Sequence, residues 1–215
     1  SLNGKITSNS NFKNIYVSYA PDDLGNSMGA ALYVNHVILN QKRDSSFNSS
    51  YLGPKFSDDD ITKILDDQNI SFETLNHRNE TIAKLLSEKN VIAIFEGKSE
   101  FGERALGNRS ILADPRDENM KDKINSVIKY RESYRPFAPS VKFEDADKYF
   151  EVPTGYECFF MEKVIPVKMS YRKKLPAVTH IDGSARLHTV KKEHNPIFYD
   201  LLNEFEKISG YPILL

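Results

Sequence analysis

The residues best suited to chemistry in this sequence are two arginines in a glycine-bounded segment, residues 97–110. Arg104 and Arg109 lie close to Gly102 and Gly107 there. A guanidinium binds a phosphate or a carboxylate through paired donors at fixed geometry, and glycine lets the backbone approach such a ligand closely. The segment is therefore predicted to wrap the oxygens of a phosphate or carboxylate group.

A simpler interpretation of these arginines is surface ion pairing. Glu100 and Glu103 are close in sequence, and an exposed ion pair stabilises a fold by only about 0–1 kcal/mol. Charge alone favours ion pairs, whereas the flanking glycines favour a ligand.

A second polar cluster, residues 130–140, holds Arg131 and Arg135. Pro136 restricts Arg135 to an extended backbone, which would hold its side chain in one direction. Two arginine clusters in one domain suggest a pocket for a phosphorylated small molecule. The alternative for Arg131 and Arg135 is a solvated loop.

A third group of candidates, His180, Asp182 and Arg186, is predicted to lie on a strand-turn-strand unit. Arg186 is a further candidate for anion binding. His180 could act as a general base or as a phosphate ligand, and its alternative is a structural histidine. Asp182 precedes Gly183, a hairpin turn signal, so its alternative is a turn residue.

Two further residues, Asp23 and Cys158, could carry chemistry. Asp23 stands in an acidic turn before a glycine- and alanine-rich segment, which could hold a metal or a nucleotide. One carboxylate cannot make a tight metal site, so the alternative is a helix N-terminal acid. Cys158 is the only cysteine and lies in an apolar run, which predicts a buried hydrophobe and excludes a disulfide within the chain.

The elements that must position these residues alternate between strand and helix patterns, which predicts an α/β domain. The predicted strands are residues 14–18, 91–95 (continuously apolar and buried), 137–143, 159–167, 177–181 and 186–190. The predicted helices are residues 27–39, 58–65, 80–88, 117–128 and 197–208, the last of which starts at Asn195-Pro196 and is ended by Gly210. Ser57 and Asp60 resemble a capping box, residues 40–51 read as a linker at a domain boundary, and residues 168–174 read as a solvated hairpin loop.

The bulk composition is that of an ordinary soluble protein, with 215 residues, 40% apolar and 27% charged. The formal charge of −1 argues against nucleic acid as a partner. The sequence has no stretch that reads as a membrane span and no signal pattern at its N-terminus. A cytoplasmic location without membrane partners is therefore expected.

Several long motifs resemble one known family. Residues 96–141, 176–186 and 210–215 are similar, in order, to the C-terminal domain of NodU/CmcH-type O-carbamoyltransferases. Residues 23–31 match an Asp-x-Gly-x-x-x-Gly-Ala-Ala motif at the end of that family's N-terminal domain. The resemblance implies that residues 1–45 are the remnant of an actin/sugar-kinase-like lobe. Residues 46–215 would then form a YrdC-like domain with a twisted mixed sheet flanked by helices.

The resemblance also implies a reaction. In the family this domain uses carbamoyl phosphate and ATP, expected with Mg²⁺, to make carbamoyl-adenylate. The other domain holds an iron ion and passes the carbamoyl group to a hydroxyl of a sugar-like or natural-product acceptor. The residues implied as catalytic are Arg104, Arg135, Arg186 and His180. The residues implied to bind nucleotide or carbamoyl groups are Arg104, Ala105, Leu106, Gly107, Asn108, Arg109, Ser110, Arg135 and Arg186, with Asp23 as the metal candidate.

The chain departs from the family pattern in two places. The family continues past its Gly-x-Pro-x-Leu-Leu segment into an Asn-Thr-Ser-Phe-Asn motif, whereas this chain ends at Leu215, and most of the first domain with its metal-binding histidines is missing. We therefore expect a fragment that binds carbamoyl phosphate or ATP weakly and cannot complete transfer, and a parent protein that forms a homodimer. Two alternatives stay open: a threonylcarbamoyl-adenylate-forming enzyme that serves tRNA modification, and a non-catalytic nucleotide-binding module.

Overall fold

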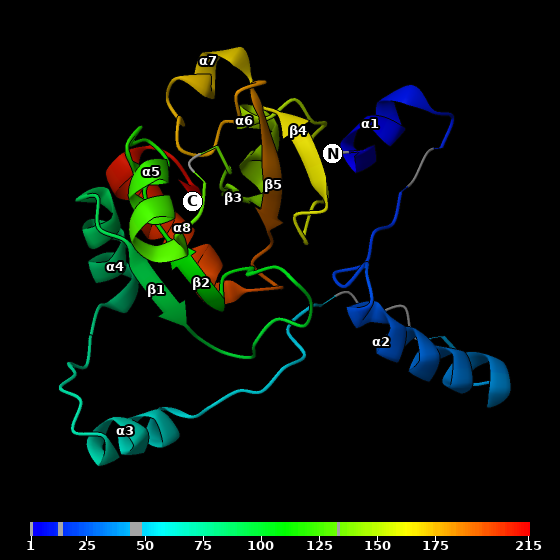
Figure 1. The fold of residues 1–215 in the computed structure, drawn as a ribbon, viewed down its shortest axis with the longest axis horizontal. Coiled ribbons are helices and arrows are strands. Elements are labelled where there is room, and N and C mark those ends of the chain that lie inside the picture. Colours follow the sequence, from blue (N-terminus) through cyan, green and yellow to red (C-terminus); the bar gives the residue numbers. More distant parts are fainter. Residues whose placement is uncertain (1, 13–14, 44–48, 133) are drawn as a thin grey trace.

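The computed structural model describes residues 2–12, 15–43, 49–132 and 134–215, and it has a mixed α/β fold (Figure 1). The strands of these residues form one four-stranded and one two-stranded sheet. Helices flank both sheets, as Figure 1 shows. The predicted fold class, a mixed sheet flanked by helices, is confirmed.

The larger sheet has the strand order β4-β5-β3-β6. Strand β5 is parallel to β3 and antiparallel to β4, and β6 is antiparallel to β3. The strands are β3 Ser140–Lys142, β4 Lys163–Pro166, β5 Ser184–Val190 and β6 Ile213–Leu214. All residues of β5 except Arg186 are buried, as expected for an interior strand covered on both faces. The sequence prediction of this strand is confirmed, and those around β3 and β4 were too long.

The smaller sheet pairs β1 Ile92–Phe95 with β2 Arg109–Leu112, antiparallel, with Phe95 opposite Arg109. The strand predicted at β1 is confirmed. Its predicted burial is wrong, because only Ile94 of β1 is buried and Phe95 is 58% exposed. A two-stranded antiparallel sheet can leave one face to solvent. Residues 96–108, which connect the two strands and contain Arg104, are called the arginine loop below, and Arg109 is the first residue of β2.

Two helices, α4 Arg78–Ser87 and α8 Pro196–Ser209, pack against each other and cover one apolar cluster. Asn195 caps α8 by accepting the N–H of Phe198 at 3.1 Å, and Gly210 ends it with φ +78°, a left-handed conformation that glycine adopts without strain. The sequence signals for the start and end of this helix are confirmed.

A second apolar cluster lies around the larger sheet and includes Val141, Leu187 and Ile213. Cys158 belongs to it and is fully buried, as predicted; burial raises the pKa of its thiol above the usual range. The helical elements around this cluster are short: α5 Met120–Ile124, a π-helical turn Asn125–Lys129, a 3₁₀ turn Phe143–Asp145, α6 Ala146–Tyr149 and α7 Met169–Arg172. The helix predicted over residues 117–128 is thus confirmed over its later part.

Two predictions near the end of the chain are wrong. Residues 177–181 form turns instead of a strand, because the N–H groups of Val178 and Thr179 donate to the carbonyl of Leu175 instead of to a partner strand. The basic run 168–174 is not a simple hairpin loop, since helix α7 occupies its middle.

The N-terminal elements lie beside or away from the sheets (Figure 1). Helix α1 Leu2–Asn9 lies beside β4, where Asn3 Nδ2 donates to the carbonyl of Glu162 at 3.0 Å. Helix α2 Leu24–Tyr33 continues as a π-helical turn, Val34–Ile38, and buries none of its residues. The helix predicted over residues 27–39 is therefore confirmed.

The remaining helix, α3 Asp58–Asp67, begins with the predicted capping box, because Ser57 and Asp60 each accept the other's backbone N–H. The strand predicted at 14–18 is wrong over residues 15–18, where Tyr16 is 76% exposed; residue 14 lies outside the described residues. The domain boundary at 40–51 remains a prediction, since residues 44–48 also lie outside them. In the described residues no helix is long and apolar enough to cross a membrane.

Candidate functional site

The segment that joins β1 to β2 folds around one carboxylate oxygen, Glu100 Oε1. Three backbone N–H groups donate to this oxygen: those of Leu106 (2.7 Å), Asn108 (2.9 Å) and Arg109 (3.4 Å). The fourth N–H of this stretch, that of Gly107, donates to Ser110 Oγ at 2.9 Å. Oxygens of the protein itself therefore satisfy every amide from residue 106 to 109 in this conformation.

Arg109 is engaged by the same loop. Its guanidinium lies 3.7 Å from the centre of the Phe95 ring and donates to the carbonyls of Glu96, Gly97 (3.2 Å) and Asn108 (2.9 Å). These bonds tie the two ends of the connection together. Arg109 thus has structural contacts in this conformation, and its predicted role in ligand binding remains a prediction.

Arg104 is placed differently, because no backbone carbonyl accepts from it among the described residues. Its guanidinium is 3.4 Å from the carboxylate of Glu103, and both side chains are over one-third exposed, so the ion pair contributes little stability. This contact matches the ion-pair alternative for Arg104. Ala105, its neighbour, is exposed, and Leu106 is buried.

Arg186, on β5, comes close to Arg104 although the two are distant in sequence. Burial lowers the pKa of the Arg186 guanidinium, the charge of Arg104 lowers it further, and the carboxylate of Glu103 acts in the opposite direction. In the part of the chain that the structure describes, Arg186 has no hydrogen bond and no ion pair. Two neighbouring guanidinium groups, one of them unpaired and half-buried, favour an anion between them.

Both arginines line one cavity of about 130 Å³. Its other walls are α1, the segment 17–21 and the segment 160–162, and they include Asn3, Tyr19 and Glu162. Glu103 also lines it, so the cavity combines two guanidinium groups with two carboxylates. The arrangement can hold a small group that carries both acceptor oxygens and N–H donors.

The segment around Tyr19 supports the tip of the arginine loop. The rings of Tyr19 and Phe101 meet edge-on at 6.3 Å. Gly102 has φ +119°, and a Cβ there would lie 2.3 Å from the carbonyl oxygen of Tyr19. The side chains of Asp22 and Glu103 interact, which lowers the pKa of Asp22 and raises that of Glu103.

His180 lies in a hydrogen-bonded chain with Ser184 and Asp182. Ser184 Oγ is 2.6 Å from Asp182 Oδ1 and 3.1 Å from His180 Nδ1. Because a carboxylate only accepts, Ser184 donates to Asp182 and accepts from Nδ1–H, which leaves His180 Nε2 with a free lone pair. Nε2 is buried and has no partner.

The charge state of His180 follows from its surroundings. Burial is the main cause that lowers its pKa, and Arg186 acts in the same direction against the carboxylate of Asp182, so the neutral form is favoured. Asp182 itself is the predicted turn residue, since its Oδ1 also accepts the N–H of Ser184 at 3.0 Å. The predicted strand before this turn is absent, as described above.

The second arginine cluster is separate from this cavity. Arg135 forms an ion pair with Glu132 at 2.8 Å, and both side chains are 54% exposed. Arg131 donates to Asn125 Oδ1 at 2.6 Å and lies over the ring of Phe137. Within the described ranges no hydrogen bond, ion pair or charge effect joins Arg135 to Arg104 or Arg186. The predicted role of Arg135 in the same pocket remains a prediction.

Asp23 is exposed and precedes α2. No three His, Cys, Asp or Glu residues of the described chain lie where they could hold a metal ion together. Asp23 as a metal ligand remains a prediction, and we derive no chemical step through a metal. Arg104 and Arg186, by contrast, suit the phosphate groups of a nucleotide.

Three residues that support the site were not singled out as such from the sequence: Tyr51, Glu100 and Asn195. Tyr51 Oη donates to the carbonyl of Leu106 at 2.8 Å, and Asn195 Nδ2 donates to Tyr51 Oη at 3.1 Å and to Asn108 Oδ1 at 2.8 Å. Burial raises the pKa of Tyr51 to about 12, so it stays a donor. The sequence suggests Glu100 only as an ion-pair partner of the arginines, and no sequence spacing indicates its amide contacts.

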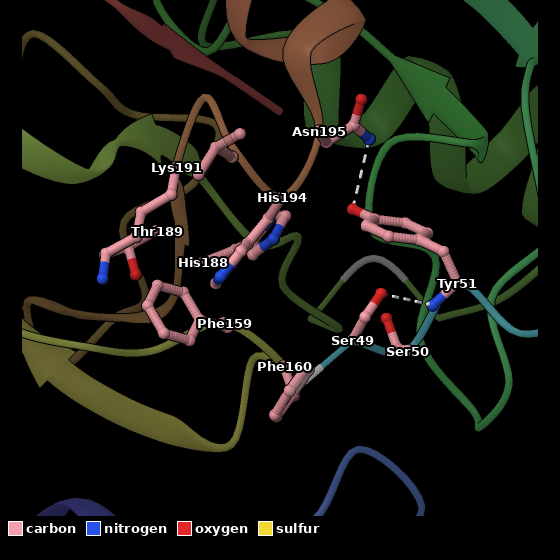
Figure 2. A pocket seen from close by; sticks show the side chains of 11 residues that line it. Ser49, Ser50, Tyr51, Phe159, Phe160, His188, Thr189, Lys191, His194 and Asn195 are labelled. Atoms are coloured by element: carbon pink, nitrogen blue, oxygen red, sulfur yellow. Dashed lines mark hydrogen bonds between the residues drawn. The ribbon is translucent and has the colours of Figure 1, made fainter. Parts of the chain in front are cut away.

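A second cavity lies beside this network and is much smaller, about 20 Å³ (Figure 2). Figure 2 shows Tyr51 bonded to Asn195 on one side, with His188, His194 and Phe159 opposite. Ser50 Oγ is buried there without a partner. The volume and the polar lining suit a single buried water molecule, so this cavity is too small for a substrate.

His188 in that cavity predicts an acid-sensitive fold. The ring is fully buried and close to Ser140 Oγ (2.9 Å), and burial lowers its pKa from 6.5 to about 3. Below pH 6.5 the unfolded chain binds a proton at this histidine and the folded protein does not. The contribution of His188 to the free energy of unfolding is therefore complete above that pH. It should fall towards pH 3 by about 1.4 kcal/mol per pH unit.

The measurement is urea unfolding at several pH values. The non-titrating variant His188→Gln should lose less stability than the wild type between pH 6.5 and 4.5. Equal losses in the two proteins would contradict the assignment of this acid sensitivity to His188.

Comparison with known proteins identifies the family. Residues 83–215 match the family described as carbamoyltransferase C-terminus. The chain is 42% identical to nodulation protein NolNO of Sinorhizobium fredii over its whole length, which is 32% of that protein. It is 40% identical to nodulation protein NolO of Bradyrhizobium diazoefficiens, again over its whole length and 40% of that protein.

A further relative is nodulation protein U of Rhizobium fredii, 33% identical over 94% of this chain and 33% of that protein. The chain thus spans between 32% and 40% of the length of these three curated relatives. The resemblance to NodU/CmcH-type proteins is confirmed, and the chain belongs to the carbamoyltransferase C-terminus family.

Proposed function

We propose that this chain is the part of an ATP-dependent O-carbamoyltransferase that binds carbamoyl phosphate and ATP and forms carbamoyl-adenylate. The remainder of a longer protein would then transfer the carbamoyl group to a hydroxyl of a sugar-like or natural-product acceptor. Membership of the family supports carbamoyl transfer. The observation that carries the proposal for this chain is the meeting of Arg104 and Arg186 at one cavity.

The two guanidinium groups suit a small phosphorylated ligand. Arg186 is half-buried, lacks a partner and is repelled by Arg104, so a dianion between them relieves the repulsion and gains charge-assisted hydrogen bonds. The cavity of about 130 Å³ is below the roughly 300–1,000 Å³ of pockets for drug-sized ligands. Carbamoyl phosphate, or the reacting end of a nucleotide, matches it better than a whole nucleotide.

The carboxylates of the cavity suit the carbamoyl end of the ligand. A carbamoyl NH₂ group donates two hydrogen bonds, and Glu103 and Glu162 in the cavity wall are acceptors. His180 does not line this cavity, but with an unpartnered Nε2 and a lowered pKa it is our candidate to accept the proton that water loses as it cleaves carbamoyl phosphate into carbamate and phosphate. An oxygen of that carbamate then bonds to the α-phosphorus of ATP as pyrophosphate leaves. This chemistry depends mainly on positioning and charge neutralisation.

Several features of the whole protein are part of the same proposal. Mg²⁺ would accompany the ATP phosphates, while an iron ion and the acceptor site would belong to the rest of the protein. We propose a cytoplasmic protein, and a homodimer for the parent. The relatives called nodulation proteins are compatible with an oligosaccharide-like acceptor.

The test is calorimetric titration of the chain with carbamoyl phosphate and then with ATP–Mg²⁺, followed by an assay of pyrophosphate release. We expect saturable binding of carbamoyl phosphate that Arg104→Ala weakens about tenfold, the size expected for a lost contact to a charged group. The exposed Arg43, replaced by alanine, is the control. Binding that is equal in the wild type and Arg104→Ala would contradict the proposed site, and no binding to the wild type would contradict the proposed function.

A further inference from the structure

We infer that Glu100 is a positioning residue, an anion built into the loop that holds Arg104 at the cavity. The inference rests on the proposed function and adds a residue to that site. Its basis is the contact of Glu100 Oε1 with the N–H groups of Leu106, Asn108 and Arg109 at 2.7, 2.9 and 3.4 Å. Neighbouring amides that converge on one oxygen form the type of concavity that binds anions.

The first contact closes the neck of a short loop. The bond between Glu100 and the N–H of Leu106 brings together the two ends of the segment 101–105, at whose tip Arg104 lies. A charge-assisted hydrogen bond is about twice as strong as a neutral one. Without the carboxylate, three amides would lose their shared acceptor and the neck would open.

The tip and the neck are each attached to a different part of the protein. Phe101 and Gly102 contact Tyr19 at the tip. At the neck, Tyr51 donates to the carbonyl of Leu106, and Asn195 links Tyr51 to the start of α8. Arg104 is therefore presented from a loop fixed at both ends, and Glu100 supplies the charged contact that closes it.

The backbone amides of residues 106–109 already have acceptors, which indicates where a bound phosphate would make its contacts. Because Glu100 and Ser110 take the N–H groups of residues 106–109, a bound phosphate would meet the side chains of Arg104 and Arg186 instead of this backbone. The anion that the loop amides attract is part of the protein itself.

The experiment removes the built-in anion and supplies a soluble one. Glu100→Ala is compared with Glu118→Ala, which removes the same charge from an exposed position that has no hydrogen bond or ion pair within the described residues. Amide exchange of Leu106 and Asn108 is followed by NMR, and carbamoyl phosphate affinity by calorimetry, each without and with added acetate. Should Glu100→Ala fail to fold, Glu100→Gln, which removes the charge but keeps an acceptor oxygen, takes its place.

We expect Glu100→Ala to exchange both amides at least about tenfold faster and to bind carbamoyl phosphate about tenfold more weakly. Acetate should reverse both changes in part, and Glu118→Ala should behave as the wild type. Unchanged affinity, or unchanged amide exchange, would overturn the inference. If the wild type binds no carbamoyl phosphate, the proposed function fails, and amide exchange with its acetate rescue alone decides whether Glu100 holds the loop.

Discussion

Replacing Arg186 by alanine is expected to weaken carbamoyl phosphate binding by about 100-fold, which corresponds to about 2.7 kcal/mol. The half-buried guanidinium has no partner among the described residues, so its donors are available to a ligand, and hydrogen bonds to charged groups contribute about 1.5–3 kcal/mol each. The affinity is measured by calorimetric titration.

Two further variants make this result specific. Arg186→Lys keeps the charge but loses the paired donors, so an intermediate affinity is expected. Arg43→Ala removes an exposed arginine and should bind as the wild type. The free energy of unfolding should change little in Arg186→Ala, because no hydrogen bond is lost and repulsion by Arg104 is removed. Wild-type affinity in Arg186→Ala would contradict the assignment of the anion site to this cavity.

The substitution Gly107→Ala should destabilise the protein by about 3 kcal/mol or more. Gly107 has φ +112°, and a Cβ at this position would lie 2.6 Å from the ring of Phe198, a residue of α8 that is buried in the core. Both the backbone conformation and the clash with a buried ring oppose the methyl group. Urea unfolding followed by circular dichroism measures the change.

A matched glycine elsewhere serves as the control. Gly29 lies in helix α2, where an added Cβ meets nothing within 4 Å. Alanine there should stabilise the helix by about 0.5–1 kcal/mol. A Gly107→Ala variant as stable as the wild type would show that the arginine loop does not need its left-handed turn.

Local signals in the sequence predicted the helices well. The capping pairs at Ser57 and Asn195 and the terminating Gly210 are each observed, because caps act over three or four residues and depend little on tertiary context. Strands were predicted less well. Residues 177–181 have a strand-like composition but bond locally to Leu175, since strand formation needs a neighbour that sequence periodicity does not reveal.

The sequence indicates which kinds of residue make up the candidate site, but it does not indicate how the fold arranges them. The glycine-bounded loop drew attention to Arg104, yet the approach of Arg104 to Arg186 depends on where β5 begins. The amides expected to face a phosphate are instead satisfied by Glu100 and Ser110. From the sequence, Glu100 is an ion-pair partner of the arginines a few residues downstream. Only the fold shows that its carboxylate turns back onto the amides of the loop.

The most direct test of the central claim is an NMR titration with carbamoyl phosphate that follows the Nε–H signals of the arginine side chains. If Arg104 and Arg186 hold the ligand, their signals shift together and saturate with one dissociation constant, while those of Arg109 and Arg131 stay in place. Shifts confined to Arg131 and Arg135, or no shifts at all, would contradict a carbamoyl phosphate site in the cavity between Arg104 and Arg186.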